Sequence, residues 1–140
     1  DQVRKGLADR PDDRGEFDLA AYASVSVGAD GEAAREAARP PVAFIAAGSP
    51  PPVLNRHGID ADRADEVGDA IAAGDFSDAF DLVTPAMIDA FCAAGTVEEV
   101  ADRLAAVLEY ADSIVVGSPL GPDLDAAIDL AAEAYDRAQD

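Results

Sequence analysis

Residues 113–122 of this 140-residue chain read Ser-Ile-Val-Val-Gly-Ser-Pro-Leu-Gly-Pro, and this stretch decides the fold. The apolar run Ser113–Val116 predicts a buried strand, and the glycines and prolines after it predict a tight loop that leads into a helix. In parallel α/β folds, ligands bind at the carboxyl ends of the strands. We therefore expect Gly117, Ser118 and Pro119 to lie at a ligand site.

A second strand is predicted over Leu19–Val27, where β-branched and small residues follow a polar segment, residues 1–18, that has the pattern of a helix end and a linker. Helical patterns fill most of the interval between the two strands, and such crossovers imply a parallel sheet. Two strands cannot cover both faces of a parallel sheet, and a complete (β/α)8 barrel needs about 250 residues. The sequence therefore predicts an α/β fold, the carboxyl-terminal portion of a (β/α)8 TIM barrel. It forms a single partial domain over residues 1–140, with a helical insertion at about 40–92.

Several helix boundaries are predicted from capping residues. We expect a helix over 31–39 that Pro40 and Pro41 stop, and an apolar segment over 42–47 that is helical, although six residues do not separate helix from strand by periodicity. A Pro-rich loop follows at 48–52. The other signals are an Asp60 cap for a helix over 61–73, a Thr84-Pro85 helix start, a Thr96–Glu99 capping box, and a last helix with Leu124, Ile128, Ala131 and Tyr135 along one stripe.

The chain is strongly acidic, with 29 Asp and Glu against 10 Lys and Arg, for a net charge of −19. No basic patch is present, so the composition argues against nucleic-acid binding and against anionic membrane surfaces. In molar salt the Debye length falls to about 3 Å, which screens the self-repulsion of such a chain. Because the acids are spread along every predicted helix, we expect a protein of a salt-loaded cytoplasm.

The single cysteine, Cys92, allows neither an internal disulfide nor a cysteine-based zinc site, and its apolar surroundings predict a small buried hydrophobe. The acidic runs lack the ligand pattern of a calcium loop, so no metal site is expected. The sequence shows no leader pattern and no long apolar run, which favours a cytoplasmic protein. The chain begins with Asp1 in place of Met, which leaves a processed chain or a truncated one.

Three blocks of sequence together resemble a known family. They are Val42–Pro50 running into Leu54–Asp60, Ala73–Phe76 with Met87–Phe91, and Val116–Pro122. In this order and spacing they resemble the carboxyl-terminal half of 5,10-methylenetetrahydromethanopterin reductase, a member of the bacterial-luciferase-like superfamily of (β/α)8 barrels. The resemblance covers roughly Leu19 to Tyr135.

This resemblance implies coenzyme F420 as the cofactor, and hydride transfer from reduced F420 to methylene-tetrahydromethanopterin to give the methyl form. The extreme acidity leaves methylene-tetrahydrofolate open as the substrate. The alternatives are another luciferase-like oxidoreductase that uses F420 or a flavin such as FMN, and a non-catalytic half-barrel. The resemblance also implies a homo-oligomer when the protein is full length, and it places the first barrel strands, with much of the cofactor site, outside this chain. The chain alone is therefore expected to be inactive.

The candidate cofactor-binding residues are Gly117, Ser118, Pro119 and Ser26, and no catalytic residue is assigned within the chain. Backbone amides around Ser118 could face a phosphate or a cofactor tail, whereas the acidic Asp123 and Asp125 oppose an anion and favour a structural turn. The Ser26 hydroxyl points either at a ligand in the barrel mouth or at a partner in the protein interior.

Overall fold

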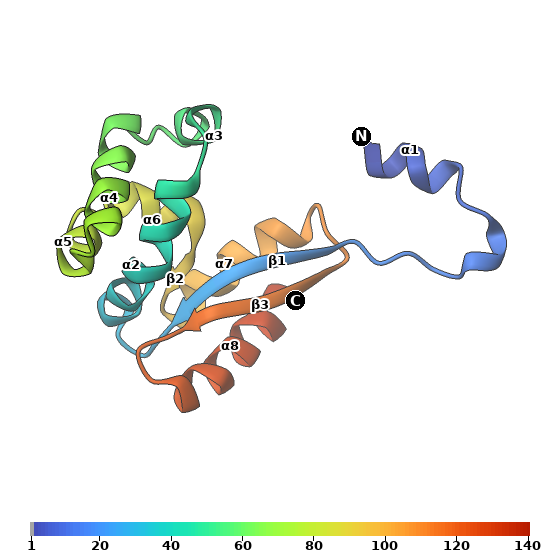
Figure 1. Ribbon diagram of the computed structural model, residues 1–140. Coiled ribbons are helices and arrows are strands. Elements are labelled where there is room, and N and C mark those ends of the chain that lie inside the picture. Colours follow the sequence, from blue (N-terminus) through green and yellow to red (C-terminus); the bar gives the residue numbers. More distant parts are fainter. Residues whose placement is uncertain (1) are drawn as a thin grey trace.

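A computed structural model describes residues 2–140, and Asp1, the start of the predicted helix end, lies outside the described residues. Within this range three parallel strands form one sheet in the order β2-β1-β3 (Figure 1). The strands are β1 (Ala20–Val27), β2 (Ala93–Gly95) and β3 (Ser113–Leu120). The predicted parallel α/β sheet is confirmed, whereas the short β2 was not predicted.

The two faces of the sheet differ in what covers them. Side chains alternate between faces, and Val25 and Val27 of β1 point toward α7 (Val97–Leu108) and α8 (Leu124–Ala138). On the opposite face, Tyr22 is 69% exposed and its register partner Val115 is 52% exposed. The amino-terminal half of that face is therefore open, as expected for a sheet whose remaining strands lie elsewhere.

Helices gather at the carboxyl ends of the strands, where the chain passes from β1 to β2 (Figure 1). We call α2 to α6 the helical layer. Its members are α2 (Gly31–Gly48), α3 (Pro51–Arg56), α4 (Ala61–Ala73), α5 (Phe76–Asp81) and α6 (Pro85–Phe91). The layer buries its own apolar cluster, in which Val42, Val67 and Met87 are fully buried.

Most predicted caps are confirmed. Asp60 accepts a hydrogen bond from the Asp62 amide and opens α4, and Gly74, in the left-handed conformation, ends that helix. Thr84 caps α6 ahead of Pro85. The segment before β1 contains α1 (Gln2–Ala8) and a short 3-10 turn (Asp12–Arg14), in line with a helix end and a linker.

The predicted stop at Pro40-Pro41 is wrong, because α2 runs through both prolines to Gly48. The buried side chains of α2 lie on one face before and after the prolines. Packing of this face against the other helices of the layer therefore outweighs the backbone hydrogen bonds that the prolines remove. These buried residues are Ala34, Ala38, Val42, Ala43 and Ala46. The predicted loop at 48–52 is also too long, since Pro51 and Pro52 occupy the first turn of α3, where a missing N–H costs nothing.

Two further corrections concern the end of the chain. The predicted loop over Gly117, Ser118 and Pro119 is instead part of β3, which runs to Leu120. Gly117 pairs with Ser24 of β1, and the register then shifts, so that Leu120 pairs with Ser26 and an extra residue of β3 bulges between these two pairs. In α8 the predicted stripe is rotated. Leu124 and Ile128 are 57% and 54% exposed, whereas the buried residues are Ala127, Ala131 and Ala134. The small alanines let α8 approach the sheet closely.

Candidate functional site

The predicted site residues lie at the carboxyl end of β3, beside the carboxyl end of β1. Gly117 is buried beneath the ring of Tyr22, which occupies the space that a Cβ on Gly117 would need. Ser118 is exposed, Pro119 is half-buried, and the peptide bond between them is cis. The structure thus brings Ser118 and Pro119 to an accessible strand end and gives Gly117 a packing role.

The backbone directly after Pro119 is conformationally unusual. Leu120 has φ = 72°, a left-handed conformation that is rare for a non-glycine residue. Gly121 follows, and its Cα lies against the Val27 carbonyl so closely that no side chain fits there. Strained backbone of this kind persists where surrounding packing holds it, and such positions cluster at ligand sites.

A cleft of about 250 Å³ separates the carboxyl end of β1 from the start of α8. Two carboxylates lie in its wall. Asp30 accepts hydrogen bonds from the Glu32 and Ala33 amides at the start of α2, and Asp123 accepts one from the Ala126 amide at the start of α8. The lining residues include these two acids and no basic one: Val27, Gly28, Ala29, Asp30, Pro122, Asp123, Ala126, Ala127 and Leu130.

Both helix N-termini at the cleft are therefore capped by the chain's own carboxylates, which repel an anion and occupy the amides that would bind it. The predicted phosphate-facing role of this junction does not fit the structure. Ser118 presents an exposed hydroxyl beside the half-buried Pro119, at the end of β3.

Ser26 is fully buried, and its hydroxyl donates a hydrogen bond of 2.6 Å to the carbonyl oxygen of Ala34 in α2. The hydroxyl proton is thereby committed to a protein acceptor. Of the two predicted roles for this residue, the arrangement favours the interior serine with a satisfied partner. Its effect is to tie the end of β1 to the first turns of α2.

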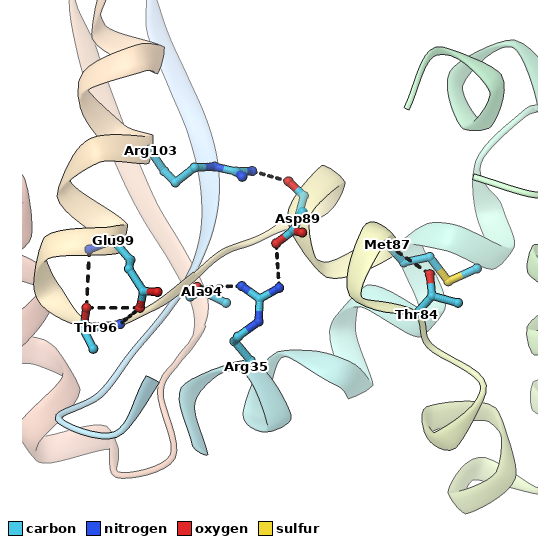
Figure 2. A network of polar contacts seen from close by, with 8 residues as sticks. All are labelled: Arg35, Thr84, Met87, Asp89, Ala94, Thr96, Glu99 and Arg103. Carbon is cyan, nitrogen blue, oxygen red and sulfur yellow. Dashed lines mark hydrogen bonds and ion pairs between the residues drawn. The ribbon is translucent and has the colours of Figure 1, made fainter. Parts of the chain in front are cut away.

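A polar network that no sequence pattern predicts joins the helical layer to the sheet and α7 (Figure 2). Arg35 of α2 contacts the Asp89 carboxylate of α6 at 2.6 Å and reaches the Ala94 carbonyl of β2 at 3.4 Å. Arg103 of α7 donates to the backbone carbonyl of Asp89. Arg35 and Asp89 are 54 residues apart in the chain, so no local pattern reveals their pairing.

The titratable groups near this network do not have the properties of catalytic groups. Burial raises the pKa of the Cys92 thiol to about 11, against the smaller opposing effect of Arg103 and Arg35. The Thr96 amide and hydroxyl hold the pKa of the Glu99 carboxyl below its ordinary value, and the capping box predicted from the sequence is confirmed. Cys92 is thus an inert buried thiol at neutral pH.

Two properties of the described residues complete the site. Within residues 2–140 no group of three or more His, Cys, Asp or Glu side chains is arranged to hold a metal ion. In the same range every helix is too short or too polar to cross a lipid bilayer.

Comparison with known proteins places this geometry in a family. The sequence pattern of luciferase-like monooxygenases matches residues 1–113. Three relatives are called 5,10-methylenetetrahydromethanopterin reductase. The protein of Methanopyrus kandleri is 41% identical over 94% of this chain and 38% of its own length, and that of Archaeoglobus fulgidus is 42% identical over 93% and 41%. The protein of Methanolobus tindarius is 43% identical over 92% of this chain and 40% of its own length.

A solved structure supports the same assignment. The coenzyme F420-dependent tetrahydromethanopterin reductase from Methanopyrus kandleri matches with a TM-score of 0.82 and 44% identity, over 90% of this chain and 36% of that one. The resemblance inferred from the sequence blocks is confirmed, as is the assignment of the sheet to part of a luciferase-like barrel. The chain spans about two fifths of the length of the curated relatives it matches. On its sequence and its fold, the chain belongs to the family of luciferase-like monooxygenases.

Proposed function

We propose that this chain is part of an F420-dependent oxidoreductase that transfers a hydride from reduced F420 to methylene-tetrahydromethanopterin, or to methylene-tetrahydrofolate, and forms the methyl compound. The observation that carries the proposal is the identity of 41–43% to three reductases of this name over more than nine tenths of the chain. Another F420- or FMN-dependent member of the family is the alternative, and a non-catalytic half-barrel is a further one.

The role of this chain in the reaction is to shape one end of the barrel. Ser118 and Pro119, at the accessible end of β3, are the residues we propose to meet the ring of F420, with Gly117 beneath them giving the strand room to pack under Tyr22. F420 supplies the hydride when bound, and the protein orients the ring and excludes water. The carboxylates of Asp30 and Asp123 in the cleft beside α8 would repel an anionic part of the cofactor.

The surroundings in which the enzyme works follow from its charge. We propose a salt-loaded cytoplasm, because a net charge of −19 spread over the helices is screened only at high ionic strength. We also propose a pterin or folate one-carbon substrate and a homo-oligomer in the full-length enzyme. The same charge argues against nucleic acid and anionic membranes as partners.

A chimeric enzyme tests the proposed reaction. The matching segment of the Methanopyrus kandleri reductase is replaced by this chain, and oxidation of reduced F420 is followed by absorbance with each of the two methylene-pterins in molar KCl. We expect F420-dependent turnover with at least one pterin. A Ser118→Ala variant of the chimera should raise KM for F420 more than it lowers kcat.

A second chimera, carrying the same segment of the Archaeoglobus fulgidus reductase, is the matched control because that segment comes from another relative with the same name as the host. If the control turns over and the chimera with this chain folds but does not oxidise F420 with either pterin, the proposal is wrong. Retention of FMN by the folded chimera would favour the flavin-dependent alternative.

A further inference from the structure

The buried apolar side chains form two clusters that have no residue in common. One lies within the helical layer and includes Val42, Val67 and Met87. The other lies between the sheet and helices α7 and α8 and includes Val25 and Leu104. The layer and the sheet therefore each have an apolar core of their own, and they touch where α2 and α6 pack against the sheet.

These two bodies, the layer and the sheet with α7 and α8, meet at β2, the short strand that pairs with the end of β1. Ala94 belongs to the cluster of the layer, whereas its neighbour Ala93 packs against the cluster under the sheet. Apolar contact across the boundary is thus provided by small side chains, which bury little area. Directional polar contacts therefore carry a larger share of the attachment here than inside either body.

One polar contact across the boundary is the buried hydrogen bond from Ser26 of β1 to Ala34 of α2. The charged side chains at the boundary meet at Asp89, near the end of α6, the last helix of the layer (Figure 2). Its carboxylate accepts from Arg35, near the start of the layer, at 2.6 Å, and its backbone carbonyl accepts from Arg103 of α7. Arg35 also donates to the Ala94 carbonyl at 3.4 Å. Asp89 of α6 thus contacts the first helix of the layer and the sheet-side helix α7, and Arg35 adds the contact to β2.

Three facts give these contacts weight. Hydrogen bonds between a guanidinium and a carboxylate are among the strongest in proteins. The Arg35 side chain is 28% exposed and the Asp89 side chain 52%, so the contact is shielded from competing water and salt mainly on the arginine side. Basic residues are scarce, 10 against 29 acidic ones, and two of them are used at this boundary, where they also offset the repulsion between the acidic layer and the acidic sheet helices.

We propose that Asp89 is the centre of an ionic latch that fixes the helical layer against the carboxyl ends of the strands, and that opening the latch releases the layer as one body while both apolar clusters stay packed. The latch is a property of this fold and does not depend on the reaction proposed above.

The test measures a distance across the boundary and a distance within the layer. Two double variants carry spin labels at exposed positions. The boundary pair is Asn55→Cys in α3 with Asp129→Cys in α8, and the pair within the layer is Asn55→Cys with Asp69→Cys in α4. Cys92 is buried with a raised pKa and takes up label slowly. Pulsed electron–electron double resonance on the whole chain then gives the distance distribution between the two labels of each pair.

With Asp89→Asn we expect a second, longer population of the boundary pair that is about fivefold larger than in the wild-type chain, because an ion pair with one half-exposed partner contributes up to about 1 kcal/mol. The pair within the layer should keep its single narrow distribution. Arg35→Lys should give an intermediate population, because an ammonium group cannot reproduce the forked contact with both Asp89 and Ala94.

Glu66→Gln is the matched control, since it breaks the 2.7 Å ion pair with Arg63 inside α4 and leaves the boundary alone. It should change neither distribution. The proposal is overturned if Asp89→Asn leaves the boundary pair unchanged. It is equally overturned if both pairs broaden together, whether by loosening of the layer or by global unfolding, because the two bodies would then not be separable.

Discussion

Gly121, just after β3, lies directly against the carbonyl oxygen of Val27 at the end of β1, and a Cβ on Gly121 would overlap that oxygen. The same Cβ would stand 2.9 Å from the Cβ of Ala127 in α8. The ends of both long strands and the first turns of α8 are therefore packed at backbone distance. Any side chain at position 121 would separate the elements that form the candidate site.

Gly121→Ala should lower the free energy of unfolding by about 3 kcal/mol, because overpacking against backbone is relieved only by moving a strand. Gly117→Ala meets the exposed ring of Tyr22, which can rotate away, so we expect a loss of only about 1 kcal/mol there. Urea unfolding of both variants in molar KCl measures the difference. Equal losses at the two glycines would show that the contact with Val27 is softer than the structure indicates.

The parallel sheet and most helix ends were predictable, because their signals are local. Asp60, Thr84 and Thr96 each cap a helix through hydrogen bonds to amides two or three residues away, and such spacings are visible in a sequence. The short strand β2 was missed for the opposite reason. Its three residues are two alanines and a glycine, which have no β propensity, and their pairing with β1 alone makes them a strand.

The position of β3 could be predicted from its apolar run, although the strand extends to Leu120 and not only to Val116. Asp123 could be recognised as an acid at a helix start, but Asp30, which lines the same cleft, belongs to a segment far away in the chain. Helix propensity favours the end of a helix at Pro40 and Pro41, whereas the buried face of α2 continues through both prolines. In both cases tertiary packing decided what local patterns could not.

The capping box at the start of α7 should make stability depend on pH. Thr96, through its amide first and its hydroxyl second, holds the pKa of Glu99 below the value it has in the unfolded chain. The resulting stabilisation is present above the ordinary carboxyl pKa and is lost as the pH falls through the lowered value. Thr96→Ala should raise the pKa of Glu99 partway to its ordinary value, since the amide remains, and should cost about 1 kcal/mol at neutral pH.

An NMR titration of the Glu99 side chain in both proteins measures this shift. If the Glu99 titration is the same with and without the Thr96 hydroxyl, the amide alone accounts for the effect and the prediction is wrong.

Cys92 should be unreactive in the folded chain. Burial raises its pKa from the ordinary 9.0 to about 11, so the thiolate fraction at pH 8 is about a hundredfold lower than in the unfolded protein. Alkylation with iodoacetamide at pH 8 should be slow without denaturant and fast in guanidinium chloride. Stability should also fall as the pH rises between about 9 and 11, because the unfolded thiol ionises before the folded one.

A Cys92→Ala variant separates the thiol from other groups that titrate at high pH. The stability of this variant should fall less steeply between about pH 9 and 11 than that of the wild-type chain, and the fall that remains is due to the other groups. Rapid alkylation of the folded wild-type chain would mean that the boundary around β2 opens often, and would contradict a thiol held in a closed interior.

The last prediction concerns Ser26, whose two possible roles lead to different outcomes. Its hydroxyl donates to the Ala34 carbonyl in a fully buried position, so Ser26→Ala should lower the free energy of unfolding by about 1 kcal/mol, the net value of one such hydrogen bond. In the chimeric reductase the same substitution should leave KM for F420 unchanged, whereas Ser118→Ala should raise it. A residue that contacts the ligand would behave in the reverse way, with little change in stability and a clear loss of cofactor affinity. Urea unfolding and a titration with F420 on the same two variants therefore decide whether Ser26 anchors α2 or belongs to the binding surface.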